Sequence, residues 1–240
     1  MFVNTFIYFL AKRYTLGYNQ IKSCEKGTFM NLQMKRYIRK SEYTNEKNNK
    51  KDNFNFLNKK YCKKHQTVIA GDSITEIFNM ELFDSYIKSN DTFVYNRGIS
   101  GDTSNHFLDR FEENVLYLEP KNLVILIGTN DLTLIDDYTY VAENIDKVLE
   151  LSRKKCPNVN LILQAVYPVD YKNVKKNLKI KNLNKLLSDI AVKHSAFFLD
   201  LTSKLSDSKG GFNPKYTYDG LHPNAKGFEI AAKEIIPFLI

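Results

Sequence analysis

The sequence predicts an α/β protein, a three-layer α/β/α sandwich on a flavodoxin-like, five-stranded parallel sheet. Short β-prone runs alternate along the chain with longer segments of helical periodicity, an order typical of parallel sheets with helices on both faces. The run 123–127 is apolar at every position, which indicates a central strand buried on both faces. These two observations set the fold class, and the strand order that we expect is 2-1-3-4-5.

The elements are expected to alternate from residue 67 onward. Strands are predicted at five short runs: 67–70, 93–96, 123–127, 161–166 and 196–201. Helices are predicted where apolar residues recur at helical spacing: 74–88, 104–118, 139–154, 174–194 and 224–238. The expected order brings the carboxyl ends of the first three strands together, at the edge where open α/β sheets bind their ligands.

The residues before the first strand are far more basic than the rest. Residues 1–66 hold 15 Lys and Arg against 4 Asp and Glu, a net charge of +11, whereas residues 67–240 hold 20 against 23, a net of −3. We therefore expect a basic, partly helical N-terminal extension over residues 1–58, with a polar linker or loop at 45–51. A single globular domain is expected over residues 59–240.

The composition of the chain bears on its location and partners. The apolar stretch 2–11 is too short to span a bilayer, and positive charges follow it rather than precede it as in a secretory signal. The three cysteines show neither metal-ligand spacing nor a disulfide framework: Cys24, Cys62 and Cys156. We expect a cytoplasmic protein with a solvated extension and no specific nucleic-acid partner. The alternative is a weak peripheral contact of residues 1–26 with anionic membranes.

A serine stands at the junction between the first predicted strand and the first predicted helix. Helix amides and the positive end of the helix dipole face an incoming carbonyl group at such a junction, which suits Ser73 as a nucleophile. The alternative is structural, because serine is also a preferred N-cap residue. The motif Gly71-Asp72-Ser73 alone does not decide between the two interpretations.

His222 is the candidate base for this serine. Asp219 precedes it by three residues, and Pro223 restricts its backbone to extended or turn conformations, which favours a loop that presents the ring. Asp219 can then reach Nδ1 and leave Nε2 free for Ser73. A lone Asp-x-x-His would more often be a solvated turn. The other histidines lie in a Lys-rich stretch, on the expected surface of a helix and at a helix end: His65, His106 and His194.

A serine esterase also needs donors for the oxyanion of its tetrahedral intermediate, and each donor typically contributes about 10²–10³ in rate. Three candidates are the Ser73 amide, the Gly98 amide and the Asn130 side chain. Gly98 lets the backbone approach a substrate closely, and Asn130 follows the most apolar strand. The alternative for Asn130 is a turn of helix-capping residues. Asp72 and Asp131 are expected to support the site rather than to react.

These blocks resemble the signature of the SGNH (GDSL-type) hydrolases. Its four signature residues fall on Ser73, Gly98, Asn130 and His222, with Asp219 as the third triad member. The resemblance runs from residue 67 to the end of the chain. Within it, residues 95–103 are especially similar to the platelet-activating-factor acetylhydrolase-like and bacterial acylhydrolase branch. It implies an α/β/α fold for the domain and ester hydrolysis without a metal or a cofactor. A Gly-x-Ser-x-Gly elbow of the ordinary α/β-hydrolases is absent from the sequence.

The sequence thus predicts a serine esterase or acylhydrolase that removes acetyl or short acyl groups from a small-molecule, carbohydrate or lipid ester. A thioesterase, a lysophospholipase or an acyltransferase would use the same residues, and analogy of fold does not choose among them. The non-enzymatic alternative is a flavodoxin-like module that binds a small ligand at the same sheet edge. The loops 132–139, 167–175 and 203–217 are expected to set the acyl and alcohol groups. Within the second loop, residues 167–169 are either a pocket wall or a strand terminator.

Overall fold

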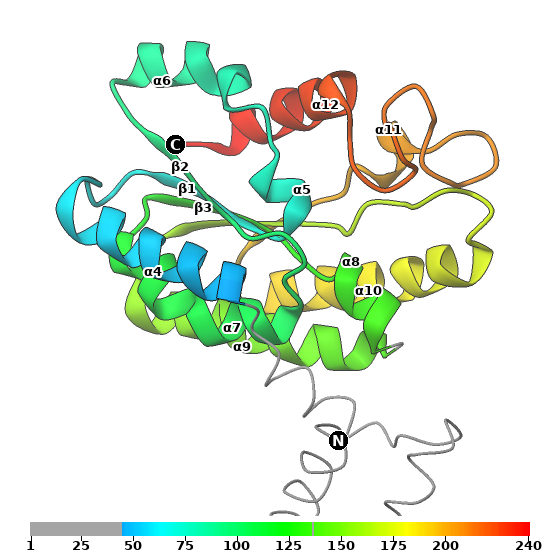
Figure 1. Cartoon of the computed structure of the whole chain (residues 1–240), viewed down its shortest axis with the longest axis horizontal. Helices are drawn as coiled ribbons and strands as arrows, with labels where there is room; N and C mark the ends of the chain where they lie inside the picture. Colours follow the sequence, from blue (N-terminus) through cyan, green and yellow to red (C-terminus); the bar gives the residue numbers. More distant parts are fainter. Residues whose placement is uncertain (1–44, 136) are drawn as a thin grey trace, which may run out of the picture. The chain divides into compact units, whose positions relative to one another are not determined.

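A computed structural model describes residues 45–135 and 137–240 and contains one five-stranded parallel sheet (Figure 1). Its strands are β1 (Thr67–Gly71), β2 (Val94–Gly98), β3 (Asn122–Leu126), β4 (Asn160–Gln164) and β5 (Phe197–Leu199). Their spatial order is β2-β1-β3-β4-β5, and every neighbouring pair is parallel. The predicted fold class and strand order are therefore confirmed. In this register Gly71 pairs with both Gly98 and Leu126, which sets the ends of the first three strands at one level.

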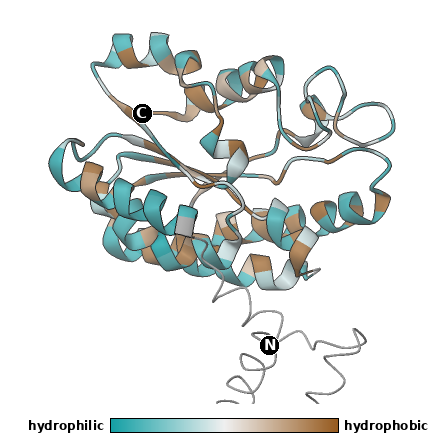
Figure 2. Ribbon diagram, viewed as in Figure 1, coloured by the Kyte–Doolittle hydropathy of each residue, from teal (hydrophilic) through white to brown (hydrophobic). Residues whose placement is uncertain are grey.

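Helices cover both faces of the sheet, with an apolar layer on each side (Figures 1 and 2). Alternate residues of the central strands face opposite ways, so that Val68 and Ile125 belong to one buried cluster and Ile69 and Val124 to the other. The first cluster lies under α7 (Ser104–Asn114), α9 (Tyr138–Lys155) and α10 (Val174–Lys193). The second lies under α5 (Ser73–Glu76), the 3₁₀ turn η1 (Met80–Phe83) and α12 (Ala225–Ile235).

The predicted helix 74–88 is wrong as a single element. The segment forms the one-turn helix α5, η1 and then α6 (Asp84–Asn90). Asn96 on β2 donates its side-chain amide to the Thr75 carbonyl at 2.6 Å, an acceptor that a continuing helix would need for itself. Asn79 is extended, and Ile77, which was expected on the core face, is 38% exposed. The sequence did not predict two short helices, α8 (Thr129–Leu134) and α11 (Thr202–Leu205). The last residues of two predicted helices form 3₁₀ turns instead, η2 (Leu116–Leu118) and η3 (Ile236–Phe238).

The predicted linker at 45–51 is also wrong, because these residues open the helix α4 (Asn45–Lys60). This helix is tied to the end of α7 by polar contacts. Asn58 donates to the carbonyl of Asn114 at 3.0 Å, and the Asn114 side chain donates to the Lys51 carbonyl at 3.1 Å. Because these contacts are polar, the helix α4 could not be predicted from the spacing of apolar residues. The helix belongs to the same compact unit as the sheet, so that unit begins earlier than the boundary predicted after residue 58.

Two further predictions fall on residues 1–44, which lie outside the described part of the chain: most of the partly helical extension and the membrane contact of residues 1–26. Among the helices that the structure describes, none is both long and apolar enough to cross a membrane.

Candidate active site

Ser73 is the first residue of α5 and follows the end of β1 by two positions. The N-cap of this helix is Asp72, whose Oδ1 accepts a hydrogen bond from the Ile74 amide at 3.0 Å. The cap is therefore supplied by Asp72 and not by Ser73, so the structural alternative for this serine does not account for its position. Instead, Ser73 Oγ lies 3.0 Å from Nε2 of His222.

The histidine is held by the loop that carries it. Its Nδ1 lies 2.6 Å from Oδ2 of Asp219, and the other oxygen of the same carboxylate accepts from the His222 amide at 2.7 Å and from the Leu221 amide at 2.9 Å. Thr217 donates its hydroxyl to the His222 carbonyl at 2.6 Å. Both ends of the imidazole are thus fixed, one against Asp219 and the other against Ser73, as the sequence predicted.

The surroundings of the Asp219 carboxylate favour its ionised form. Partial burial raises its pKa, but the hydrogen bonds from the His222 amide and ring and from the Leu221 amide outweigh burial, so its pKa lies below the ordinary aspartate value. An ionised carboxylate at Nδ1 keeps the proton there, which leaves Nε2 as the acceptor that faces Ser73. The hydrogen bonds among Ser73, His222 and Asp219 are therefore oriented so that Nε2 can accept the serine proton, as general-base catalysis requires.

Asn130 follows the end of the neighbouring strand β3, as the second residue of α8. Its Nδ2 donates to the carbonyl of Asp102 at 2.9 Å, which leaves the second hydrogen of the amide for another acceptor. Asp131 is fully buried and accepts from the Ser104 amide at 2.8 Å and from the Ser104 hydroxyl at 2.7 Å. Asp131 thus ties α8 to the N-terminus of α7, and the cap of α8 is the backbone of Gly128, at φ 130°.

Gly98 lies against the backbone of α5, whereas it was expected from the sequence to lie close to a substrate. A Cβ built on this residue would lie 2.2 Å from the Glu76 amide nitrogen, so glycine is required by its close approach to α5. The Gly98 amide donates to Oδ1 of Asn96 at 2.8 Å and thus already has an acceptor. The Ser73 amide, at the first position of a helix, has no acceptor within that helix. Of the two backbone amides predicted as donors, the Gly98 amide is therefore the one that is already bonded to a side-chain oxygen.

This arrangement agrees with the comparison with protein families, in which the model of the GDSL-like lipase/acylhydrolase family matches residues 69–230. The chain belongs to the GDSL-like lipase/acylhydrolase family. The family resemblance drawn from the sequence is thereby confirmed.

Several known proteins are similar to this GDSL-type hydrolase. A GDSL-like lipase from Bacteroides thetaiotaomicron is 27% identical, with a TM-score of 0.68 over 79% of this chain and 96% of that one. A protein of Bacteroides fragilis described as an acylhydrolase is 29% identical, with a TM-score of 0.68 over 78% and 94%. An N-acylneuraminate cytidylyltransferase of Escherichia coli is 32% identical over 173 residues, 68% of this chain. The chain spans 40% of the length of that curated relative.

The site of this GDSL-type hydrolase contains a buried carboxyl group whose titration the sequence did not reveal. Asp72 is 1% exposed, and its Oδ2 has no hydrogen-bond partner among the residues that the structure describes. Burial raises the pKa of Asp72 to about 7; the hydrogen bond from the Ile74 amide opposes this rise, and the nearby charges of Asp102 and Asp131 add to it. The group is therefore partly protonated near neutral pH.

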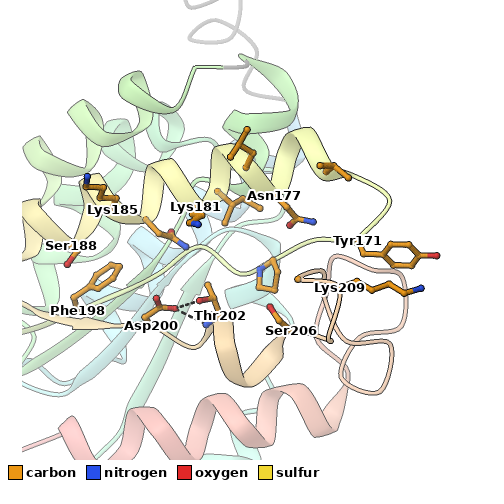
Figure 3. Close-up of a pocket in the computed structure, with 16 residues that line it drawn as sticks. Tyr171, Asn177, Lys181, Lys185, Ser188, Phe198, Asp200, Thr202, Ser206 and Lys209 are labelled. Atoms are coloured by element: carbon orange, nitrogen blue, oxygen red, sulfur yellow. Dashed lines mark hydrogen bonds between the residues drawn. The ribbon is translucent and has the colours of Figure 1, made fainter.

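A cavity of about 480 Å³ adjoins the triad loop of the GDSL-type hydrolase. Its walls are Asp219 and Leu221 on one side and, on the others, residues of two predicted specificity loops, among them Thr133 and Val169. Tyr167 is instead buried in the core, and β4 already ends at Gln164, so of residues 167–169 only Val169 forms a wall of this cavity. A separate cavity of about 730 Å³ lies between α10, β5 and α11 and includes no triad residue (Figure 3).

One sequence interpretation at this site was wrong. His106 was expected on a helix surface, but it is 5% exposed and forms a capping box with Thr103 at the start of α7. Among the described residues, no three His, Cys, Asp or Glu side chains gather closely enough to hold a metal ion.

Proposed function

We propose that the protein hydrolyses carboxylic esters through an acyl-serine intermediate, with Ser73 as nucleophile, His222 as base and Asp219 as the residue that orients the base. The observation that carries this proposal is the continuous hydrogen-bonded line, 3.0 Å from Ser73 Oγ to His222 Nε2 and 2.6 Å from His222 Nδ1 to Asp219 Oδ2. A serine hydroxyl becomes an effective nucleophile only when such a base receives its proton.

In the proposed reaction, Ser73 Oγ forms a bond to the ester carbonyl carbon while its proton passes to Nε2 of His222. The carbonyl oxygen becomes an oxyanion, which the Ser73 amide and the Asn130 side chain stabilise by hydrogen bonds. The Gly98 amide can join them only by leaving its bond to Asn96. His222 then returns the proton to the departing alcohol, and water, activated by the same ring, releases the acid from Ser73.

For the substrate, we propose acetyl or other short acyl esters of a carbohydrate. The cavity beside Asp219 has the volume of a small-ligand site, and several side chains in its wall can bond to hydroxyl groups: Thr133, Asp170 and Asn173. A long acyl chain would need a longer apolar channel. The name of the Escherichia coli relative refers to N-acylneuraminate, a sugar acid, which supports a carbohydrate over a lipid. A thioesterase, a lysophospholipase and an acyltransferase remain the alternatives that share the triad.

The experiment that tests the triad is labelling with a fluorophosphonate probe, which reacts with activated serines, followed by intact-mass and peptide analysis. We expect one label, on Ser73, and none in Ser73→Ala. A label on another serine would reject the assignment. The substrate class is tested with a panel of acetylated sugars, p-nitrophenyl esters of increasing acyl length and lysolipids. Faster hydrolysis of lysolipids than of acetylated sugars would reject the carbohydrate proposal.

A further inference from the structure

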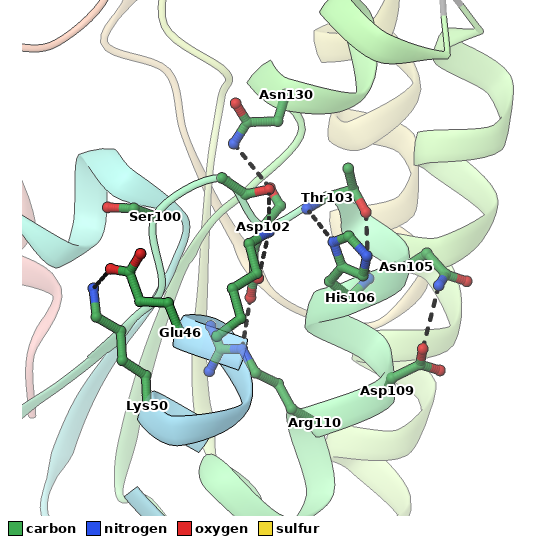
Figure 4. A network of polar contacts seen from close by, with 12 residues as sticks. Glu46, Lys50, Ser100, Asp102, Thr103, Asn105, His106, Asp109, Arg110 and Asn130 are labelled. Atoms are coloured by element: carbon green, nitrogen blue, oxygen red, sulfur yellow. Dashed lines mark hydrogen bonds and ion pairs between the residues drawn. The ribbon is translucent and has the colours of Figure 1, made fainter. Parts of the chain in front are cut away.

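The turn that follows β2 determines where the Asn130 amide points. In this turn the Asp102 amide donates to the Ile99 carbonyl at 3.1 Å, and the Asp102 carbonyl accepts from Asn130 Nδ2 at 2.9 Å (Figure 4). A displacement of this carbonyl would therefore carry the proposed oxyanion donor with it.

Two cations flank the Asp102 carboxylate, which is completely buried and whose Oδ1 accepts no hydrogen bond from the described residues. Arg110 Nε donates to Oδ2 at 2.7 Å (Figure 4). The same guanidinium donates to the Gly71 carbonyl at 3.0 Å, two residues before the proposed nucleophile. On the other side, Lys47 Nζ lies 3.5 Å from Oδ1 and donates to the Gly101 carbonyl at 2.6 Å. The Lys47 side chain is only 13% exposed, an unusual position for a lysine unless its charge is paired.

A second connection joins the same turn to the helix of the nucleophile. Glu76, the last residue of α5, accepts the Ser100 amide at one carboxylate oxygen and the Lys50 ammonium at the other. Burial raises the pKa of Glu76, but the hydrogen bonds from Lys50 and Ser100 outweigh it, so the pKa lies below the ordinary glutamate value. Glu76 therefore remains ionised at neutral pH and bridges α4, α5 and the turn.

Both lysines come from α4, which lies outside the segment 69–230 that matches the family model. We propose that α4 is a working part of the active site, in which Lys47 and Lys50 are positioning residues that fix the turn 98–102 and thereby orient the oxyanion donors. The inference rests on the proposed function, because it assigns these lysines a role in the same reaction. Neither lysine contacts the nucleophile or the base, so each acts through the backbone that it holds.

The opposing interpretation is that α4 only stabilises the fold. Its other contacts, such as those of Asn58 with the end of α7, could anchor the helix without any effect on the reaction. The two interpretations predict different kinetics. A purely stabilising helix changes the unfolding temperature but leaves the turnover of folded enzyme intact. A positioning helix changes turnover at temperatures where the variant is fully folded, because a shift of about 1 Å in a catalytic group can cost up to about 10²-fold.

The test uses the full chain and five single variants of the same helix. Lys47→Met and Lys50→Met remove the two positioning charges. Lys51→Met is the matched control, because the Lys51 ammonium faces the exposed Glu113 on α7 at 3.9 Å and makes no contact with the turn in the described part of the chain. We would measure kcat and KM for p-nitrophenyl acetate, the rate of fluorophosphonate labelling and the thermal unfolding midpoint. Lys47→Arg and Lys50→Arg test rescue by a retained positive charge.

We expect Lys47→Met and Lys50→Met to lower kcat and the labelling rate by roughly tenfold, with KM changed by less than about twofold, since the oxyanion forms only in the transition state. The arginine variants should recover most of this loss, and Lys51→Met should match the wild type. Because Lys50 is 34% exposed, its variant is expected to fold even if that of Lys47 does not.

Equal kcat values for Lys50→Met and Lys51→Met in folded, labelled enzyme would overturn the inference while leaving the proposed esterase in place. A loss that appears only in KM, or only in the unfolding midpoint, would overturn it as well. A wild-type protein that neither reacts with the probe nor hydrolyses any ester would overturn the proposed function and the inference together. The labelling of the wild type thus separates the two failures.

Discussion

Asp219 binds both the ring and the backbone amide of His222, with one carboxylate oxygen for each. A spacing of three residues in a tight loop makes this possible, because the side chain of an aspartate can accept from amides two and three positions later. The base and the residue that orients it therefore move as one unit. The distance that the fold has to maintain is the one between this loop, which precedes α12, and Ser73, which lies 149 residues earlier in the chain at the end of β1.

The first prediction concerns the nucleophile. Ser73→Ala should abolish ester hydrolysis while the thermal unfolding midpoint changes little, since the half-buried hydroxyl contacts His222 and the helix is capped by Asp72. Activity would be measured on p-nitrophenyl acetate and unfolding by circular dichroism. Retention of more than about a tenth of the wild-type rate would argue against the assignment, because loss of a nucleophile typically costs far more than tenfold.

Asn130→Ala should lower kcat by about 10²–10³ and change KM much less, because its amide is expected to stabilise charge that forms only in the transition state. Asn182→Ala, on the exposed face of α10, is the matched control and should behave as the wild type. Steady-state kinetics on a single small ester separates the two parameters. If the loss lay mainly in KM, Asn130 would be a substrate contact instead of an oxyanion donor.

The pH dependence of kcat/KM should show one ionisation on its acid side, that of His222, which must be neutral to receive the proton of Ser73. Asp219 should contribute no second step there, because the hydrogen bonds that lower its pKa keep it ionised below the range in which an ordinary aspartate titrates. Rates would be measured across the stable pH range at saturating and limiting ester. Two resolved steps on the acid side that persist in Asp72→Asn, which removes the one carboxyl group raised to about 7, would contradict this assignment.

Asp72 should make the protein less stable as the pH rises. Its pKa is about 7 in the folded chain against an ordinary 3.8, so folding favours the protonated form; the contribution is complete below about pH 4 and is lost towards pH 7. Compared with Asp72→Asn, the wild type should lose unfolding free energy on the order of 4 kcal/mol across that window. Denaturant unfolding at several pH values measures the difference, with the exposed Asp189→Asn as control. Parallel curves for wild type and Asp72→Asn would rule out a raised pKa.

The chain should tolerate loss of residues 1–29 but not of residues 1–60. The shorter deletion leaves α4 and every proposed catalytic residue in place, whereas the longer one removes Lys47, Lys50 and the contacts of Asn58. Soluble yield and turnover of p-nitrophenyl acetate measure both effects. An inactive or insoluble 1–29 deletion would mean that this segment contributes to the hydrolase domain.

The parts of the site that the sequence predicted are those whose chemistry restricts the residue type. A nucleophile, a base and an oxyanion donor admit few side chains, and parallel strands bring their carboxyl ends to one edge, so Ser73, Asn130 and His222 could be placed together in advance. The helix α4 could not be predicted, because the contacts that hold it are polar and join residues far apart in the chain. The break after α5 escaped prediction for the same reason, since its cause is the side chain of Asn96 on another strand.

The approach of Gly98 to the backbone of α5 has a consequence for any mutational survey of this enzyme. A side chain at this position would push against Glu76 and so displace the helix that begins with Ser73. Such a survey would score Gly98 among the most sensitive positions even if its amide never touched the substrate. Sensitivity to substitution and participation in the reaction are separate properties here, and only replacement of the amide itself, by an ester bond in the backbone, would tell them apart.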